Sequence, residues 1–206
     1  MKLYDVTQAP NPRRVRVFLA EKGIEVPMVQ VDMSKGEHKT PEFLTMNPSG
    51  KVPVLELDDG TCIGESVSIC RYFEAVQPEP ALFGTTPAEI GRIDMFNRQL
   101  EFELLGPVGQ AWVNGPVVAR IAAGRFEQIP AARTLGEKGA RAFYRRLDQT
   151  LQEQPYMAGD AFSIADISAL CIIDFARALV DLKPDPELAA LWRWHGSVAA
   201  RPSALA

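Results

Sequence analysis

The sequence predicts a protein in which an α/β domain precedes an all-helical domain. Three observations predict this architecture: short strands alternate with amphipathic helices in the first third of the chain, a stretch rich in proline and glycine follows, and no later segment has the pattern of a strand. We expect the α/β domain over residues 1–78 with the order β-α-β-α-β-β-α, a linker over 79–86, and the helical domain over 87–206.

The α/β domain begins with an expected strand over Lys2–Val6. The loop that follows contains Pro10 and Pro12, which we expect to delay the next element. From Arg13 to Lys22 the apolar residues recur on one helical face, and Gly23 stands where the C-cap of a helix is expected. The loop between this strand and this helix is therefore a candidate functional site.

The rest of the domain is predicted from apolar patterns bounded by turn and capping signals. The expected elements are a strand over Val26–Asp32, a short helix that Thr40 caps and that runs through Leu44, two strands over Val52–Leu57 and Thr61–Ile63 joined by an Asp-Asp-Gly turn, and a helix over Ser66–Val76.

Capping signals also organise the helical domain. Thr86 to Glu89 form a capping box, from which a long helix is expected to run to about Asn114, with a bend at Gly106 and Pro107. Three further helices are expected. The first covers Ala140–Gln152 and the last covers Glu187–Ala200. The helix between them begins with a second capping box at Ser163 to Asp166, which Phe162 and Ile167 flank as a hydrophobic staple.

The composition excludes several other classes of protein. The chain has 206 residues, of which 47% are hydrophobic and 23% charged, and its formal net charge of -4 provides no basic field for nucleic acid. We expect neither a membrane span nor export, because there is no run of about 18 apolar residues and no signal-peptide pattern. The three cysteines and two histidines are scattered, which favours a reducing, cytoplasmic setting and no metal centre.

Three short motifs stand at the ends of predicted elements: Ser49–Leu55 (SGKVPVL), Gly64–Ser66 (GES) and Phe162–Asp166 (FSIAD). With these motifs and this order of elements, the chain resembles the cytosolic glutathione transferases of bacterial type. Its loop after the first strand resembles those of the theta-like and nu-like classes, and the class stays open. The resemblance implies a thioredoxin-like first domain, glutathione as co-substrate and a homodimer.

The resemblance also implies a set of glutathione-binding residues. The Val52–Pro53 bond is expected to be cis, so that the backbone of Val52 pairs with the extended tripeptide, whereas the alternative is a proline that only shapes a loop. Glu65 and Ser66 are expected to hold the γ-glutamyl end of glutathione at the start of a helix. The alternative for this pair is an N-cap serine beside a solvated carboxylate.

Two basic residues complete the expected binding set. In theta-like classes, a histidine in the polar loop before the second helix and the lysine before the Val-Pro pair approach the glycyl carboxylate of glutathione. The resemblance therefore assigns that role to His38 and Lys51. The alternative is that both side chains are simply solvated.

The residue that would stabilise the glutathione thiolate is less evident. A free thiol with a pKa of about 8.5 is only about 3% ionised at pH 7, so these enzymes need a group that favours the anion. Ala9 occupies the position that holds serine in theta-like enzymes, and this loop contains no cysteine. Asn11, Tyr4, Thr7 and backbone N–H groups remain as candidates, and we choose Asn11.

The expected function is a glutathione transferase that attacks small hydrophobic electrophiles or disulfides, with disulfide reductase or peroxidase activity as related possibilities. The long helix of the second domain is expected to supply an apolar wall for the electrophile through Phe102, Leu105 and Trp112. The alternative function is a non-catalytic binding or regulatory protein with the same fold. A maleylacetoacetate isomerase would be expected to have a Ser-Ser-Cys loop, which is absent.

Overall fold

A computed structural model describes residues 1–122 and 127–206, which form two compact units. The first unit comprises Met1–Leu82 together with Pro202–Ala206, and the second comprises Phe83–Arg201. The helical unit ends at Arg201, whereas the helical domain was expected to run to residue 206, because the last segment of the chain packs with the first unit. There Arg13 donates a hydrogen bond to the carbonyl of Ala204 (2.9 Å).

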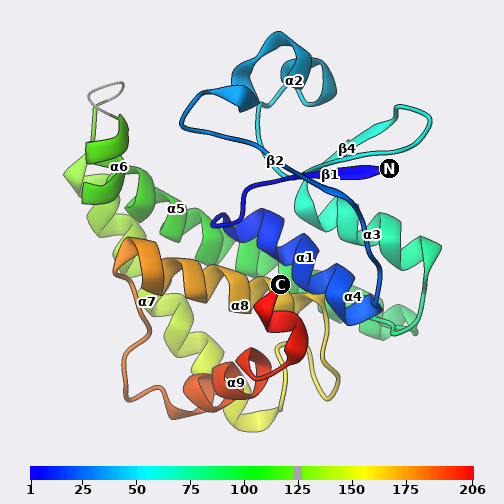
Figure 1. Cartoon of the computed structure of the whole chain (residues 1–206). Coiled ribbons are helices and arrows are strands. Elements are labelled where there is room, and N and C mark those ends of the chain that lie inside the picture. The colour runs from blue at the N-terminus through cyan, green and yellow to red at the C-terminus, as the bar shows by residue number, and fades with distance from the viewer. Residues whose placement is uncertain (123–126) are drawn as a thin grey trace. The chain divides into compact units, whose positions relative to one another are not determined.

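The first unit is a four-stranded sheet with helices on both faces (Figure 1). The strand order is β2-β1-β3-β4, in which β1 and β2 are parallel and the other pairs are antiparallel. Helices α1 and α3 lie on one face and α2 lies on the other (Figure 1). The elements are β1 (Lys2–Asp5), α1 (Pro10–Lys22), β2 (Met28–Gln30), the 3₁₀ turn η1 (Glu37–Lys39), α2 (Pro41–Met46), β3 (Val54–Glu56), β4 (Cys62–Gly64), α3 (Ser66–Val76) and the 3₁₀ turn η4 (Pro202–Leu205).

Alternation along the strands divides the core of this unit between the two faces. Val54 of β3 packs in a cluster with Val31 and with Phe43 of α2. The next residue, Leu55, points to the opposite face and pairs in register with Leu3 of β1. Leu3, Val54 and Leu55 are fully buried, so the short strands hold both helical layers in place.

Capping residues place the helix ends largely as the sequence indicates. The hydroxyl of Thr40 accepts a hydrogen bond from the backbone N–H of Phe43, and Gly23 ends α1 in the left-handed conformation with φ of 63°. Helix α1 nevertheless begins at Pro10, and the expectation that Pro10 and Pro12 delay this helix until Arg13 is wrong. Proline fits the first turn because the N–H groups of that turn have no partner within the helix.

A buried lysine ties the end of α1 to the end of α3. The side chain of Lys22 is fully buried, where its ammonium group pairs with the carboxylate of Glu74 at 2.7 Å. It also donates to the carbonyls of Gln77 (2.7 Å) and Pro80 (2.8 Å). These contacts compensate the loss of hydration of the charge and fix the chain where it leaves the sheet domain.

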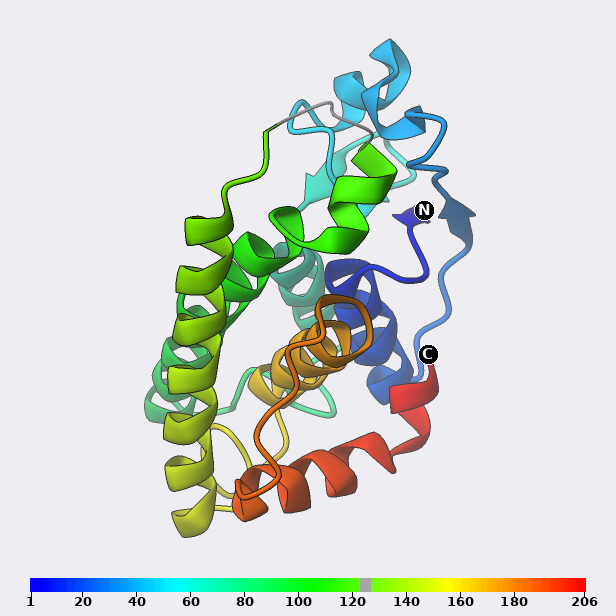
Figure 2. The same cartoon turned by 90° about the vertical axis from the view of Figure 1, so that its left-hand side faces the viewer.

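The regular secondary structure of the second unit, in its described residues, is helical apart from one isolated bridge between Tyr156 and Gly159. Figure 2 shows α7 as the longest helix of this unit, with α9 packed near its C-terminal end. None of the described helices has the length and apolar character needed to cross a membrane. The elements are α4 (Pro87–Gln99), the π-helical turn η2 (Leu100–Leu105), α5 (Gly106–Val113), α6 (Pro116–Ala122), α7 (Pro130–Glu153), α8 (Ile164–Phe175), the π-helical turn η3 (Ala176–Val180) and α9 (Ala189–Ala199).

Two features of this unit depend on tertiary packing. A π-helical turn precedes Pro107, and the N–H of Gly106 bonds there to the carbonyl of Glu101, so helical structure continues into α5. Helix α7 begins well before the expected start at Ala140. A Cβ atom at Gly136 would lie only 2.4 Å from the carbonyl oxygen of Pro107, so this glycine, a poor helix former, permits α7 to approach α5 closely.

Both predicted capping boxes are present, and they differ in burial. The box of Thr86 and Glu89 is exposed, whereas Ser163 and Asp166 are fully buried. Asp166 accepts hydrogen bonds from the backbone N–H of Met157 (2.9 Å), the indole of Trp194 (2.8 Å) and the backbone N–H of Ser163 (3.0 Å). Burial raises the pKa of Asp166 to about 6, although these donors act in the opposite direction.

We predict that Asp166→Ala lowers the free energy of unfolding by about 3 kcal/mol, because several buried donors lose their acceptor together. Glu89→Ala is the matched change in the exposed box and should have a much smaller effect, since water replaces the lost carboxylate. Denaturant unfolding of the two variants measures the difference. Equal losses would show that the buried box does not organise the helical core.

Candidate functional site

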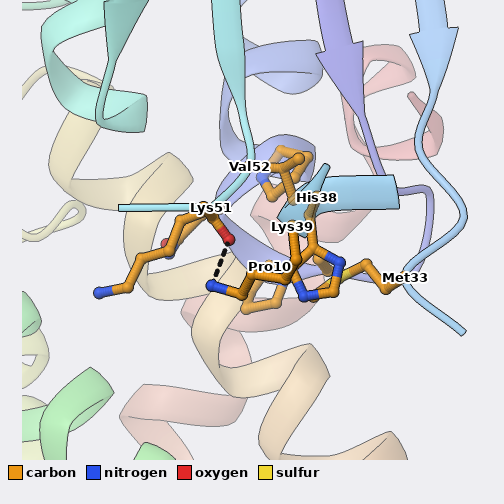
Figure 3. Close-up of a pocket in the computed structure, with 10 residues that line it drawn as sticks. Pro10, Met33, His38, Lys39, Lys51 and Val52 are labelled. Atoms are coloured by element: carbon orange, nitrogen blue, oxygen red, sulfur yellow. Dashed lines mark hydrogen bonds between the residues drawn. The ribbon is translucent and has the colours of Figure 1, made fainter. Parts of the chain in front are cut away.

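Two adjoining pockets lie in the first unit, where the loop after β1, the loop before α2 and the starts of β3 and α3 converge. Their volumes are about 340 and about 70 Å³, and both are lined by Asn11, Lys51 and Val52. His38 lines the larger pocket, shown in Figure 3, while Pro53, Glu65 and Ser66 line the smaller. The structure thus brings all the residues of the expected site to one place.

The first turn of α1 forms one wall of the larger pocket. Ala9 is the N-cap residue and has no side-chain group to cap the helix. Because Pro10 and Pro12 have no N–H, Asn11 supplies the only backbone donor among the first three residues of the helix. Its side-chain oxygen Oδ1 is buried and makes no hydrogen bond with any described residue. A donor-bearing residue therefore stands at the positive end of the helix dipole.

The other side chains considered for the thiolate point elsewhere. The hydroxyl of Tyr4 donates to Glu56 (2.8 Å), and its ring packs edge-on against Phe43 beside the sheet. The hydroxyl of Thr7 donates to the side-chain oxygen of Gln30 (2.9 Å). Neither Tyr4 nor Thr7 lines either pocket.

A buried ion pair holds the loop that leads into α1, on whose first turn Asn11 lies. Arg16 of α1 pairs with Asp5 at the end of β1 (2.5 Å) and donates a second bond to the carbonyl of Thr7 (2.8 Å). Gln30 donates to the same carboxylate of Asp5. These bonds connect strand, loop and helix, so the short loop has a defined path into α1.

The segment before β3 is shaped by a cis peptide bond and an asparagine. The Val52–Pro53 bond is cis, as the resemblance implied. The side chain of Asn47 donates to the carbonyl of Lys51 (2.8 Å) and accepts from the backbone N–H of Ser49 (3.2 Å). Sequence reasoning missed Asn47, although an asparagine that bonds its own backbone two residues on is a recognised turn signal.

Helix α3 begins at the smaller pocket with two unusual residues. Glu65 is exposed and has φ of 62° and ψ of 119°, a conformation that is costly for any residue except glycine. Ser66 is only 4% exposed, and its hydroxyl oxygen accepts a hydrogen bond from Nη1 of Arg14 (2.7 Å). The contact of Arg14 with Ser66 was not predicted, because it spans two helices that are distant in sequence.

Basic side chains gather at the far side of the larger pocket. Lys39, also missed from the sequence, donates to the carbonyls of Gly50 (3.3 Å) and Ser49 (3.4 Å), and the dashed line in Figure 3 marks the bond to Gly50. Gly50 has φ of 59°, and a Cβ atom there would lie 2.9 Å from the backbone carbonyl oxygen of His38, so glycine permits this close approach of the two loops. The side chain of Lys51 extends away from this pair (Figure 3).

The environment of His38 favours its neutral form. Burial lowers the pKa of the His38 imidazole below its usual value, and the positive charge of Lys39 lowers it further. At neutral pH this side chain therefore offers a neutral ring.

The site as a whole presents donors and positive potential in three places: the start of α1, the start of α3 and the basic cluster of His38, Lys39 and Lys51. Each of these favours an anion. Among residues 1–122 and 127–206, no three His, Cys, Asp or Glu side chains are grouped as ligands for a metal ion. The three donor-bearing places lie along two adjoining pockets, an arrangement that suits an elongated organic ligand with several negative groups.

Comparison with known proteins agrees with this arrangement. The family described as glutathione S-transferase, N-terminal domain, matches residues 9–76, and that described as glutathione S-transferase, C-terminal domain, matches residues 130–202. Glutathione S-transferase 2 of Saccharomyces cerevisiae is 41% identical over 210 residues, which cover 98% of this chain and 87% of the yeast protein. The crystal structure of Gtt2 from the same yeast has a TM-score of 0.91 at 41% identity and covers 98% of both chains.

A second type of relative is maleylacetoacetate isomerase of Rattus norvegicus, 31% identical over 189 residues, which cover 90% of this chain and 83% of the rat protein. Both curated relatives are named as enzymes, so the comparisons do not favour the non-catalytic alternative. The matched domains and the extent of the yeast match confirm the expected thioredoxin-like and helical architecture. The chain belongs to the glutathione S-transferase family, whose members use glutathione as a substrate.

Proposed function

We propose that this protein is a glutathione transferase in which Asn11 stabilises the glutathione thiolate for attack on a small hydrophobic electrophile or a disulfide. The observation that carries the proposal is the position of Asn11, which lines both pockets at the start of α1. Tyr4 and Thr7 are hydrogen-bonded to other side chains away from the pockets, so Asn11 is favoured among the side chains considered.

The chemistry requires a shift in the pKa of the thiol. Each unit by which a site lowers this pKa corresponds to about 1.4 kcal/mol of preference for the anion. The side-chain amide and the backbone N–H of Asn11 are two donors beside the positive end of a helix dipole. Oδ1 of Asn11 is buried without a hydrogen-bond partner among the described residues. The proposal assigns the contact with the ligand sulfur to Nδ2, because only the nitrogen of the side-chain amide can donate.

The rest of glutathione would occupy the other two anion-favouring places. Val52 would pair its backbone with the cysteinyl residue beside Pro53, as an added strand. Glu65 and Ser66 would hold the γ-glutamyl end, with the helix N-terminus and the hydroxyl toward its carboxylate and the side chain of Glu65 toward its ammonium group. The glycyl carboxylate would meet the basic cluster of His38, Lys39 and Lys51, where His38 acts as a neutral donor.

The helical unit offers apolar side chains suited to an electrophile wall. Phe102 is 65% exposed, and Trp112 packs edge-on against Phe175 with ring centroids 5.2 Å apart. The proposal also includes that the protein forms a homodimer and is located in the cytoplasm. Isomerisation of maleylacetoacetate is not proposed, because the loop Thr7–Pro12 contains no Ser-Ser-Cys sequence.

Asn11→Ala should lower kcat for a chloronitroaromatic substrate at neutral pH by about 10- to 100-fold, because a hydrogen bond to a charged group contributes about 1.5–3 kcal/mol. The KM for glutathione should change much less. Steady-state kinetics with both substrates varied measure these values. Gln8→Ala removes an exposed amide from the same loop and is the matched control with unchanged kcat. Unchanged turnover in Asn11→Ala would remove its side chain from the mechanism.

Ser66→Ala should weaken glutathione binding about tenfold, since the γ-glutamyl carboxylate loses a hydroxyl donor. Isothermal titration calorimetry with glutathione gives the dissociation constant. Ser68→Ala removes an exposed hydroxyl from the same helix and should leave binding unchanged. Equal behaviour of the two variants would mean that Ser66 serves only the helix.

Two substitutions at Glu65 separate backbone strain from ligand binding. Both Glu65→Gly and Glu65→Ala remove the carboxylate and should weaken glutathione binding to a similar extent. Glycine adopts positive φ without penalty, so the glycine variant should be more stable to denaturant than the alanine variant by about 1 kcal/mol. Equal stability of the two variants would contradict the strain, and unchanged affinity in both would contradict the role of the carboxylate.

A further inference from the structure

Arg14 is a buried charged residue that the proposed mechanism does not yet use. Its side chain is 1% exposed, and it lies on α1 one turn after Asn11. It lines neither pocket, yet its Nη1 atom donates to the hydroxyl oxygen of Ser66 at 2.7 Å. A guanidinium group thus stands directly behind the pocket residue at the start of α3.

This hydrogen bond fixes the role of the Ser66 hydroxyl. Arginine has donors and no acceptor, so Ser66 can only accept from it. With one lone pair of the oxygen directed at Arg14, the O–H hydrogen is turned away from α1 and is free to donate to another acceptor. Acceptance from a cationic donor also polarises the hydroxyl and makes it a better donor.

The charge of Arg14 also favours a negatively charged acceptor at Ser66. Burial weakens the screening of its charge by water, so its attraction for an anion at Ser66 is stronger than that of a surface residue. The N-terminus of α3, which begins at Ser66, has the same sign of potential. An acceptor with negative charge therefore gains more at this position than a neutral acceptor of the same shape.

We infer that Arg14 is a positioning residue that orients and polarises the Ser66 hydroxyl, and that it thereby sets the preference of the smaller pocket for a ligand α-carboxylate. The inference rests on the proposed function, in which Ser66 holds the γ-glutamyl carboxylate of glutathione. It goes further, because it assigns this selectivity to a residue that does not touch the ligand.

The test compares glutathione with γ-aminobutyryl-cysteinyl-glycine, an analogue that lacks only the α-carboxylate of the γ-glutamyl residue. Calorimetry on the full chain gives the ratio of the two dissociation constants for the wild type, Arg14→Gln, Ser66→Ala and the double variant. Arg14→Gln should reduce the preference for glutathione about tenfold, with little change in affinity for the analogue. In the Ser66→Ala background the same change should alter the preference by less than about twofold.

Arg13→Gln is the matched control, since Arg13 is also an arginine of α1 but donates to the carbonyl of Ala204 and lines neither pocket, and it should leave the ratio unchanged. If Arg14→Gln does not fold, Arg14→Lys carries the test, with a smaller loss of preference because the charge is kept. The inference would be overturned if Arg14→Gln weakened the binding of glutathione and of the analogue equally. It would also be overturned if Arg14→Gln reduced the preference for glutathione to the full extent in the Ser66→Ala background. In both cases the proposed function would stand. Unchanged glutathione affinity in Ser66→Ala would instead refute the role of Ser66 in the proposed function.

Discussion

The site depends on the fact that two helices on the same face of the sheet begin at the same pocket. Asn11 at the start of α1 and Ser66 at the start of α3 line one small cavity, so two sets of unpaired N–H groups and two positive dipole ends meet there. A ligand with negative groups spaced along its length satisfies both ends. Glutathione has such groups in its thiolate and its γ-glutamyl carboxylate, and its third negative group, the glycyl carboxylate, would meet the basic cluster of His38, Lys39 and Lys51.

A strained local conformation is part of this arrangement. Glu65 adopts positive φ, which is costly for a residue other than glycine. Such features persist where the surrounding structure determines them. Here the Asp5–Arg16 ion pair fixes the loop into α1, while the buried Asp166 box stabilises the helical unit independently of the site.

Much of the fold and of the candidate site could be predicted from the sequence, because capping residues, turns and apolar faces are local features of the chain. The helix over Ser66–Val76 has the predicted bounds, since an apolar face and a defined start coincide. The prediction that prolines delay the start of α1 is wrong because proline is favoured in the first turn of a helix. The long α7 was underestimated because Gly136 lowers local propensity while it permits packing against Pro107. The contacts of Arg14 with Ser66 and of Lys39 with Gly50 could not be predicted, because these partners are close only in the folded chain.

The central claim is that the start of α1 stabilises the thiolate of bound glutathione. A pH titration of the ultraviolet absorbance of the thiolate in the glutathione complex tests it directly, with S-methylglutathione as the reference that has no ionisable thiol. The account predicts a pKa for the bound thiol at least about one unit below the value of about 8.5 for a free thiol. A bound thiol that titrates with the pKa of free glutathione would contradict it.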